Sequence, residues 1–432
     1  MQGNRKQRRG LSRRAILKGG AAVAGVAAGP TITGFPTIWA QNIKDIVIRH
    51  SGPPVTAIPR IAEQANKELG FKVQMQASEN ADLLNRFLSQ SNTMDCADIS
   101  LVYMRYLIGR NVLQAIPVSK IKHWDKTLPL FTKGEYSDGR KAPQQGITPT
   151  MILYATGPDG QKVTPGTPTD WVTGVPTITN ADTLGIRPDL INRPVGSWAD
   201  LLSPEFKGRA ALQDNPTIGI IDVAMALEAR GDVKYVNKGN MTKEEIDQTI
   251  TKMLEIKKSG QFRSFWSTFD QSVNLMASGE VVVQSMWSPA VAAVRSRGIA
   301  CTYQPLKEGF RGWGFTLGVM KHVEGLKRDC FYEYLDWYTS GFQGAFIAKQ
   351  GYYSAQPENA KKFLTDDEWG YWFGGKVAQG DIMSPFGKLM EKAGNVRDGG
   401  SIDERLGNIA VWNSVMDEDR YLTRRWNEFI TS

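Results

Sequence analysis

The amino-acid sequence predicts an α/β protein of two lobes. Two stretches alternate strand and helix patterns, one between residues 45 and 102 and the other between residues 262 and 294. Such alternation favours mainly parallel sheets covered by helices. The chain has 432 residues, and 392 remain after an export segment of 40 is removed. A chain of that length is too long to fold around one hydrophobic core, and it suits two.

The first 40 residues have the pattern of a cleavable export signal. They contain Ser12-Arg13-Arg14-Ala15-Ile16-Leu17-Lys18, a charge-free run from Gly19 to Ile43, and a small residue at Ala40. The paired arginines resemble the bacterial twin-arginine signal, which implies the Tat export machinery as a partner, cleavage near Ala40 and a periplasmic location. The alternative is an uncleaved anchor, since the run could span a bilayer, although seven of its 25 positions are Gly or Pro.

Charge and composition narrow the function classes. Residues 1–40 carry seven Lys or Arg and no acid, so 45 basic and 44 acidic residues remain after them. This balance gives no sign of nucleic-acid binding. The scattered histidines and cysteines predict no metal site, no cofactor and at most one disulfide; they are His50, His123, His322, Cys96, Cys301 and Cys330. The common catalytic motifs are absent from the sequence, so no catalytic residue is predicted.

The first lobe begins with three strand and two helix patterns. The expected strands span 45–50, 71–76 and 98–102, and the expected helices span 56–69 and 81–90. Ligands of parallel sheets gather beyond the carboxyl ends of the strands. Ser51 and Tyr103, each next to such an end, are therefore candidate ligand residues.

The middle of the chain contains a long irregular stretch and one clear helix. Residues 141–197 are rich in Pro, Gly and Thr, and they predict a crossing between lobes followed by a loop. A helix is predicted from Thr242 to Gly260, where Thr242 and Glu245 form a capping box.

The second α/β unit follows directly. It comprises a strand at 262–266, a helix at 271–278, a strand at 281–287 and a helix that begins at Ser288-Pro289, with Ser288 as its cap. Asp270 precedes a helix and is either an N-cap or a partner for an amine. A further strand is expected at 313–320, and the remaining residues are predicted to be mainly helical.

One segment carries a resemblance to a known family. Ser197-Trp198-Ala199-Asp200-Leu201-Leu202-Ser203-Pro204-Glu205-Phe206-Lys207-Gly208-Arg209 is similar to a motif of the extracellular solute-binding proteins of ABC importers, especially the spermidine/putrescine-binding group (family 1 type). Three later segments occur in the family's order: Ala277 to Val281, Ser285 to Ser288, and Gln350 to Tyr353.

The resemblance implies a type II periplasmic-binding-protein fold with a ligand cleft between its lobes. Lobe 1 would comprise residues 41–150 and 313–352, and lobe 2 residues 151–312 and 353–432. The protein would be a monomer that delivers a small polar solute to the permease of an ABC transporter. Two other roles remain open: an enzyme exported by the twin-arginine route, and a receptor that presents its ligand to a sensor.

The resemblance also implies a set of ligand residues. Trp287, Trp313 and Tyr352 match aromatic positions of the family, but Trp313-Gly314-Phe315 stands where the family has Trp-x-Asp. A polyamine such as spermidine or putrescine is therefore one candidate, and an anionic or zwitterionic solute, such as a carboxylate or an amino-acid derivative, is the other. The complete candidate set is Ser51, Tyr103, Arg105, Asp214, Trp266, Asp270, Trp287, Trp313, Phe315 and Tyr352.

Overall fold

The computed structural model describes residues 43–432, which form one compact unit. The predicted export signal and the predicted cleavage site near Ala40 lie outside the described residues. Within the described part, no helix is both long enough and apolar enough to cross a membrane.

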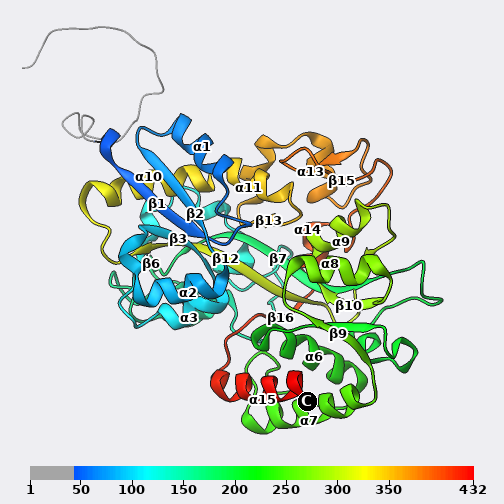
Figure 1. Ribbon diagram of the computed structural model, residues 1–432. Coiled ribbons are helices and arrows are strands. Elements are labelled where there is room, and N and C mark those ends of the chain that lie inside the picture. The colour runs from blue at the N-terminus through cyan, green and yellow to red at the C-terminus, as the bar shows by residue number, and fades with distance from the viewer. Residues whose placement is uncertain (1–42) are drawn as a thin grey trace, which may run out of the picture. The chain divides into compact units, whose positions relative to one another are not determined.

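Twelve strands form one hydrogen-bonded sheet, and we call its two halves the first sheet and the second sheet. The first sheet has a parallel centre (Figure 1). Strand β1 lies between β2 and β3 and runs parallel to both. The elements are β1 (Val47–Gly52), α1 (Pro59–Glu68), β2 (Lys72–Ala77), α2 (Asn80–Ser89), β3 (Cys96–Ser100) and α3 (Leu101–Leu107). The predicted alternation is confirmed, with shifted bounds. Helix α1 begins three residues later than expected because Pro59 occupies its first turn, where a missing N–H costs nothing.

The second sheet also has a parallel centre, with β8 between β9 and β10. Its elements are β8 (Ala210–Gln213), α6 (Pro216–Arg230), α7 (Lys243–Lys258), β9 (Phe262–Trp266), α8 (Phe269–Ser278), β10 (Val283–Met286) and α9 (Ser288–Arg295). The predicted capping box of α7 is present, since the Thr242 hydroxyl accepts from the Glu245 amide and the Glu245 carboxylate accepts from the Thr242 amide.

Two long strands join the sheets. Strand β7 (Val175–Ile186) pairs antiparallel with β12 (Phe310–Met320) and, through its last residues, with β10. Strand β12 in turn pairs antiparallel with β3. The loop expected over residues 141–197 is therefore wrong for this part, where every residue of β7 is buried. Its Pro, Asn, Asp and Gly residues are poor strand formers in isolation, and tertiary pairing overrides that preference.

Two helix starts differ from the prediction. Helix α8 begins at Phe269 and is capped by Thr268, whose hydroxyl accepts from the Gln271 amide, so Asp270 lies in the first turn and is not the cap. Helix α9 is preceded by Trp287 at the cap position, and Ser288 is its first residue and not its cap. In each case the helix begins one or two residues earlier than the sequence pattern indicates.

The rest of the chain combines helices with short strands. The remaining helices are α4 (Pro129–Thr132), α5 (Pro149–Leu153), α10 (Gly325–Thr339), α11 (Phe342–Ala348), α12 (Pro357–Ala360), α13 (Asp366–Trp372), α14 (Ile402–Leu406) and α15 (Asp419–Thr431). The remaining strands are β4 (Leu113–Gln114), β5 (Ile116–Pro117), β6 (Trp171–Val172), β11 (Thr302–Tyr303), β13 (Tyr353–Ser354), β14 (Ile382–Met383), β15 (Leu389–Glu391) and β16 (Ile409–Trp412).

One hydrophobic core of the described residues covers one face of the second sheet. Helices α6, α7 and α15 group there (Figure 1), and the indoles of Trp198 and Trp426 are fully buried within the core. The Trp198 indole donates to the carbonyl of Gly309 over 2.9 Å. This bond ties the Ser197–Arg209 segment to the residues just before β12.

Candidate solute-binding site

A cluster of three aromatic side chains lies on β12 and at the end of the α11 region. The Trp313 ring meets those of Phe315 and Tyr352 edge-on, with both centroid separations at 5.7 Å. Phe315 and Tyr352 are buried, whereas Trp313 is half-buried. We call these three residues the Trp313 cluster. Its partly exposed ring is the one available to a solute.

A second aromatic cluster lies at the carboxyl ends of β9 and β10. Trp266 is fully buried and meets Trp287 edge-on at 5.0 Å, and Trp287 stacks on Phe269 at 6.4 Å with an interplanar angle of 19°. We call these the Trp287 cluster. Trp266 supports the ring of Trp287 from beneath, so Trp287 and Phe269 present the accessible surface.

Gly351 lies between the residues that adjoin the two clusters. A Cβ at this position would lie 3.7 Å from Pro289 Cγ and 3.8 Å from Ser288 Oγ, so the Gly351 backbone lies against the start of α9. Gly351 has φ of +95°, a conformation that favours glycine. Its neighbour Tyr352 belongs to the Trp313 cluster, and Ser288 follows Trp287. Residues next to each cluster therefore lie close together.

A buried carboxylate supports Trp313 from β7. The Trp313 indole donates to Asp182 Oδ2 over 2.8 Å, and the Tyr303 hydroxyl donates to Asp182 Oδ1 over 3.0 Å. Arg311 lies 3.5 Å from the same carboxylate and 2.6 Å from Asp222. Burial raises the pKa of Asp182 to about 6, and the Arg311 charge opposes this shift. The bonds fix the indole on the strand pair that joins the sheets.

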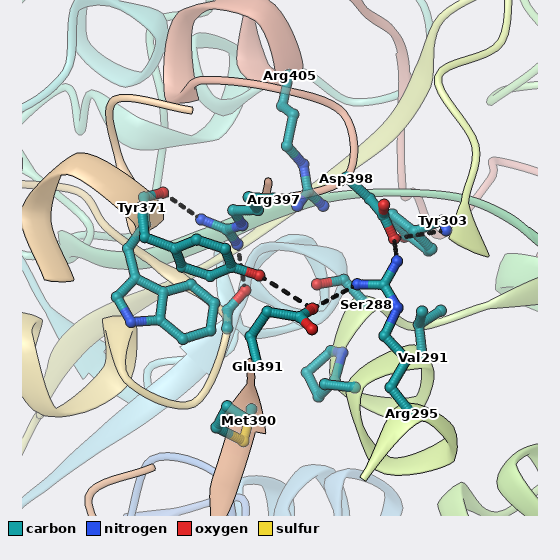
Figure 2. Close-up of a pocket in the computed structure, with 14 residues that line it drawn as sticks. Ser288, Val291, Arg295, Tyr303, Tyr371, Met390, Glu391, Arg397, Asp398 and Arg405 are labelled. Atoms are coloured by element: carbon teal, nitrogen blue, oxygen red, sulfur yellow. Dashed lines mark hydrogen bonds and ion pairs between the residues drawn. The ribbon is translucent and has the colours of Figure 1, made fainter. Parts of the chain in front are cut away.

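A cavity of about 30 Å³ lies beside α9 (Figure 2). Arg295 pairs there with Glu391 over 2.7 Å and with Asp398. Arg397 donates to the carbonyl oxygens of Trp372 and Gly351. Arg405 donates to the side-chain oxygen of Asn180 and to the carbonyl of Ala181. Three guanidinium groups therefore meet around one small space.

Comparison with known proteins assigns the chain to a family. Residues 60–370 match the family model described as a bacterial extracellular solute-binding protein, which is more than half of the chain. The chain belongs to this family. A search of curated protein sequences returned no match. The predicted function as a solute-binding protein of an ABC transporter is confirmed through this membership, and the family is a class of binding proteins rather than of enzymes.

Solved structures agree with the two-lobed binding-protein fold of this solute-binding protein. A putative spermidine/putrescine ABC transporter protein from Listeria monocytogenes is similar with a TM-score of 0.60 at 15% identity, over 89% of this chain and 98% of that one. A spermidine/putrescine substrate-binding protein from Streptococcus pneumoniae gives 0.59 at 13% identity, over 89% and 99%. A binding protein from A. tumefaciens R10, solved with agropinic acid, gives 0.53 at 12%, over 89% and 99%.

Three other candidate residues of this solute-binding protein lie outside the two aromatic clusters. Ser51 is buried within β1 and not in the loop after it. Tyr103 is half-buried in α3, where burial raises its pKa. Arg105 is exposed on α3 and donates to the Asp417 carboxylate and the Val415 carbonyl. Its guanidinium is thus engaged with the segment before α15.

The two candidate acids lie in different environments. Asp214 follows β8, is half-buried, and accepts a 2.9 Å hydrogen bond from the Trp426 indole. Asp270 is exposed in the first turn of α8, beside Phe269. Of these two acids, Asp270 is the one whose side chain makes no hydrogen bond within the described part of the chain.

Some residues of the site were not predicted from the sequence. Phe269 had an available signal, since it lies three residues after the end of β9 and directly after the capping Thr268. Asp182, Arg397 and Arg405 had none, because β7 was expected to be a loop and the C-terminal part was expected to be mostly helical. The cavity arises only where segments distant in the sequence meet.

Proposed function

We propose that the protein is the periplasmic solute-binding component of an ABC importer, exported by the twin-arginine route and cleaved near Ala40. Family membership supports the binding role, and the two tryptophan clusters supply surfaces for a solute. The observation that carries the proposal is the position of Trp313 on β12, which pairs with β3 of the first sheet and with β7, the strand that continues into the second. A ring fixed there can contact a solute held between the sheets.

Closure around the solute would follow from contacts made to both sheets at once. A ligand shifts a conformational equilibrium only by its difference in affinity for the two states. A solute that touches Trp287 and Trp313 together makes both contacts only when the sheets approach. The closed form would then be delivered to the permease of the transporter.

The charges near the clusters favour a neutral, anionic or zwitterionic solute over a polyamine. A buried ammonium group requires acidic partners. Asp182 is engaged by Trp313, Tyr303 and Arg311, and Asp214 by Trp426. Glu391 and Asp398 in the nearby cavity pair with Arg295. Of the candidate acids among residues 43–432, Asp270 alone remains, and it is exposed. This supply of acids is small for a molecule with two or more ammonium groups.

A ligand screen tests the proposal. The exported protein would be scanned by thermal shift against carboxylates, amino-acid derivatives, sugars and polyamines, because a ligand stabilises a protein by RT ln(1 + [L]/Kd). We expect a hit among the first three classes. If no compound raises the Tm, the binding role fails. Micromolar binding of putrescine or spermidine would instead overturn the proposed solute class.

Calorimetry on variants then locates the site. Trp313→Ala and Trp287→Ala should each raise the Kd of the solute found in the screen by at least about tenfold, because loss of a buried aromatic contact typically costs that much affinity. Trp369→Ala is the matched control, since Trp369 stacks on Phe373 at 4.4 Å and belongs to neither cluster. Equal affinity in all three variants would show that the solute binds at another site.

A further inference from the structure

The cavity beside α9 has an excess of positive charge. Its lining includes three arginines and two acids: Arg295, Arg397, Arg405, Glu391 and Asp398. Arg295 engages both acids. Among residues 43–432, no carboxylate lies within 4.0 Å of the guanidinium of Arg397 or Arg405. Two cations therefore face the cavity with neutral hydrogen-bond partners only.

Both of these cations are deeply buried. Arg397 is 4% exposed and Arg405 is 1% exposed. They share one aromatic partner, because the Cζ atoms of Arg397 and Arg405 lie 4.2 and 5.6 Å from the centroid of the Tyr353 ring. Burial lowers the pKa of Arg397 to about 10, and the charge of Arg405 adds to this shift. Ring contacts offset only part of the cost of burying a charge.

Donor groups around the cavity remain unused. Arg405 Nε and Trp372 Nε1 are buried without a hydrogen-bond partner in the described structure. The Ser288 hydroxyl also lines the cavity, at the start of α9. That helix has no side-chain cap bond and no acid in its first turn, so its own residues leave the positive end of its dipole uncompensated. Pro289 has no N–H and the Ala290 amide donates to the Trp287 carbonyl, so the helix contributes its dipole rather than free amides. Every one of these features favours an acceptor with negative charge.

We infer that this cavity is a binding site for one anionic group of carboxylate size. Its volume of about 30 Å³ exceeds the ~10–15 Å³ that a cavity needs to hold one water molecule on the same measure, and it suits chloride, formate or the carboxylate end of a larger molecule. Arg397, Arg405 and the start of α9 would hold the charge (Figure 2). The group comes either from a free small anion or from the transported solute, and the second source rests on the proposed function.

Titration of small anions tests the site without any solute. Formate, acetate and chloride would be titrated into the protein by calorimetry, with ionic strength held constant by a bulky sulfonate salt. We expect saturable binding with one site per chain. Arg405→Gln should weaken it by at least about tenfold, since it removes a charge-assisted partner. Absence of saturable binding to the wild-type protein would overturn the inference.

A second variant keeps the test decisive if Arg405→Gln does not fold. Ala292→Leu fills the cavity from α9 and leaves every arginine in place, so it should abolish anion binding. The first control, Ala293→Leu, makes the same change at the next residue, which does not line the cavity. The second control, Arg187→Gln, removes a buried arginine that forms an ion pair with Asp189. Both controls should bind as the wild type does. Wild-type affinity in Ala292→Leu would contradict the assignment.

Competition separates the two sources of the anion. If saturating acetate raises the apparent Kd of the solute, the solute's own carboxylate occupies the cavity. If the Kd is unchanged, the site takes a free anion. A protein that binds acetate through Arg405 but binds no solute would leave this inference standing while the proposed function fails.

Discussion

The indole of Trp313 on β12 donates a 2.8 Å hydrogen bond to Asp182 on β7, so the accessible ring of the Trp313 cluster is held by a buried carboxylate. Register places Asp182 opposite Arg311 on the same strand pair. Tyr303, Arg311, Arg405 and the Asp222 carboxylate also act on Asp182. The strands that join the two sheets thus share a charged network with the candidate binding surface.

This network predicts a pH-dependent stability. Because burial raises the folded-state pKa of Asp182 to about 6, the native state binds more protons than the unfolded chain between roughly pH 4 and 6. The contribution of Asp182 to the free energy of unfolding therefore falls as pH rises through this window. Asp182→Asn removes this component, and the stability of the variant relative to wild type should rise by about 3 kcal/mol from pH 4 to 7. Urea unfolding followed by circular dichroism measures it, and parallel profiles would contradict it.

Arg311 should be essential for stability. It is fully buried, and it lies 2.6 Å from Asp222 and 3.5 Å from Asp182. Arg311→Met leaves these acids buried without their cation and should cost about 3–5 kcal/mol in urea unfolding. Arg425→Met, which removes a surface partner of Asp247, should cost at most about 1 kcal/mol.

A double variant checks the cause of that loss. Adding Asp222→Leu to Arg311→Met removes one stranded charge, so part of the lost stability should return. If the double variant is as unstable as the two losses added together, the ion pair is not the reason.

Gly146 should tolerate no side chain. Its φ is +79°, and a Cβ would overlap the carbonyl oxygen of Trp412. Gly139 has a similar φ of +84° but open space around it. We expect Gly139→Ala to cost about 1–2 kcal/mol from backbone strain alone, and Gly146→Ala to cost a further ~1–3 kcal/mol from the overlap. Thermal unfolding of the two variants compares these costs, and equal values would exclude the overlap.

The three cysteines should be inert in the folded protein. Cys96, Cys301 and Cys330 are free and buried. Burial raises the pKa of Cys301 and Cys330 to about 12 each, so little reactive thiolate forms at neutral pH. A disulfide-exchange reagent should label none in the native state and three after unfolding without reductant. Only one labelled thiol after unfolding would reveal a disulfide.

Local signals explain which elements could be predicted. Strand β9 spans the predicted residues 262–266, and the ends of α7 follow from the capping box at Thr242 and from Gly260. Capping bonds form between residues three apart, so the sequence contains them completely. The Ser197–Arg209 segment likewise indicates the family through its local sequence alone. The candidates Trp287 and Trp313 are both half-buried. Trp313 lies within β12 as predicted, whereas Trp287 follows β10 at the cap position of α9.

The sequence by itself determined the alternation of strands and helices, the near-neutral charge beyond residue 40 and the family. Tertiary structure decided the rest of the site. Strand β7 contains Asn180 and Asp182, which disfavour an isolated strand and become buried only because Arg311, Tyr303, Trp313 and Arg405 provide partners. The cavity of Arg397 and Arg405 also depends on segments more than 100 residues apart. Partners at such distances leave no local pattern, and folding alone brings their charges together.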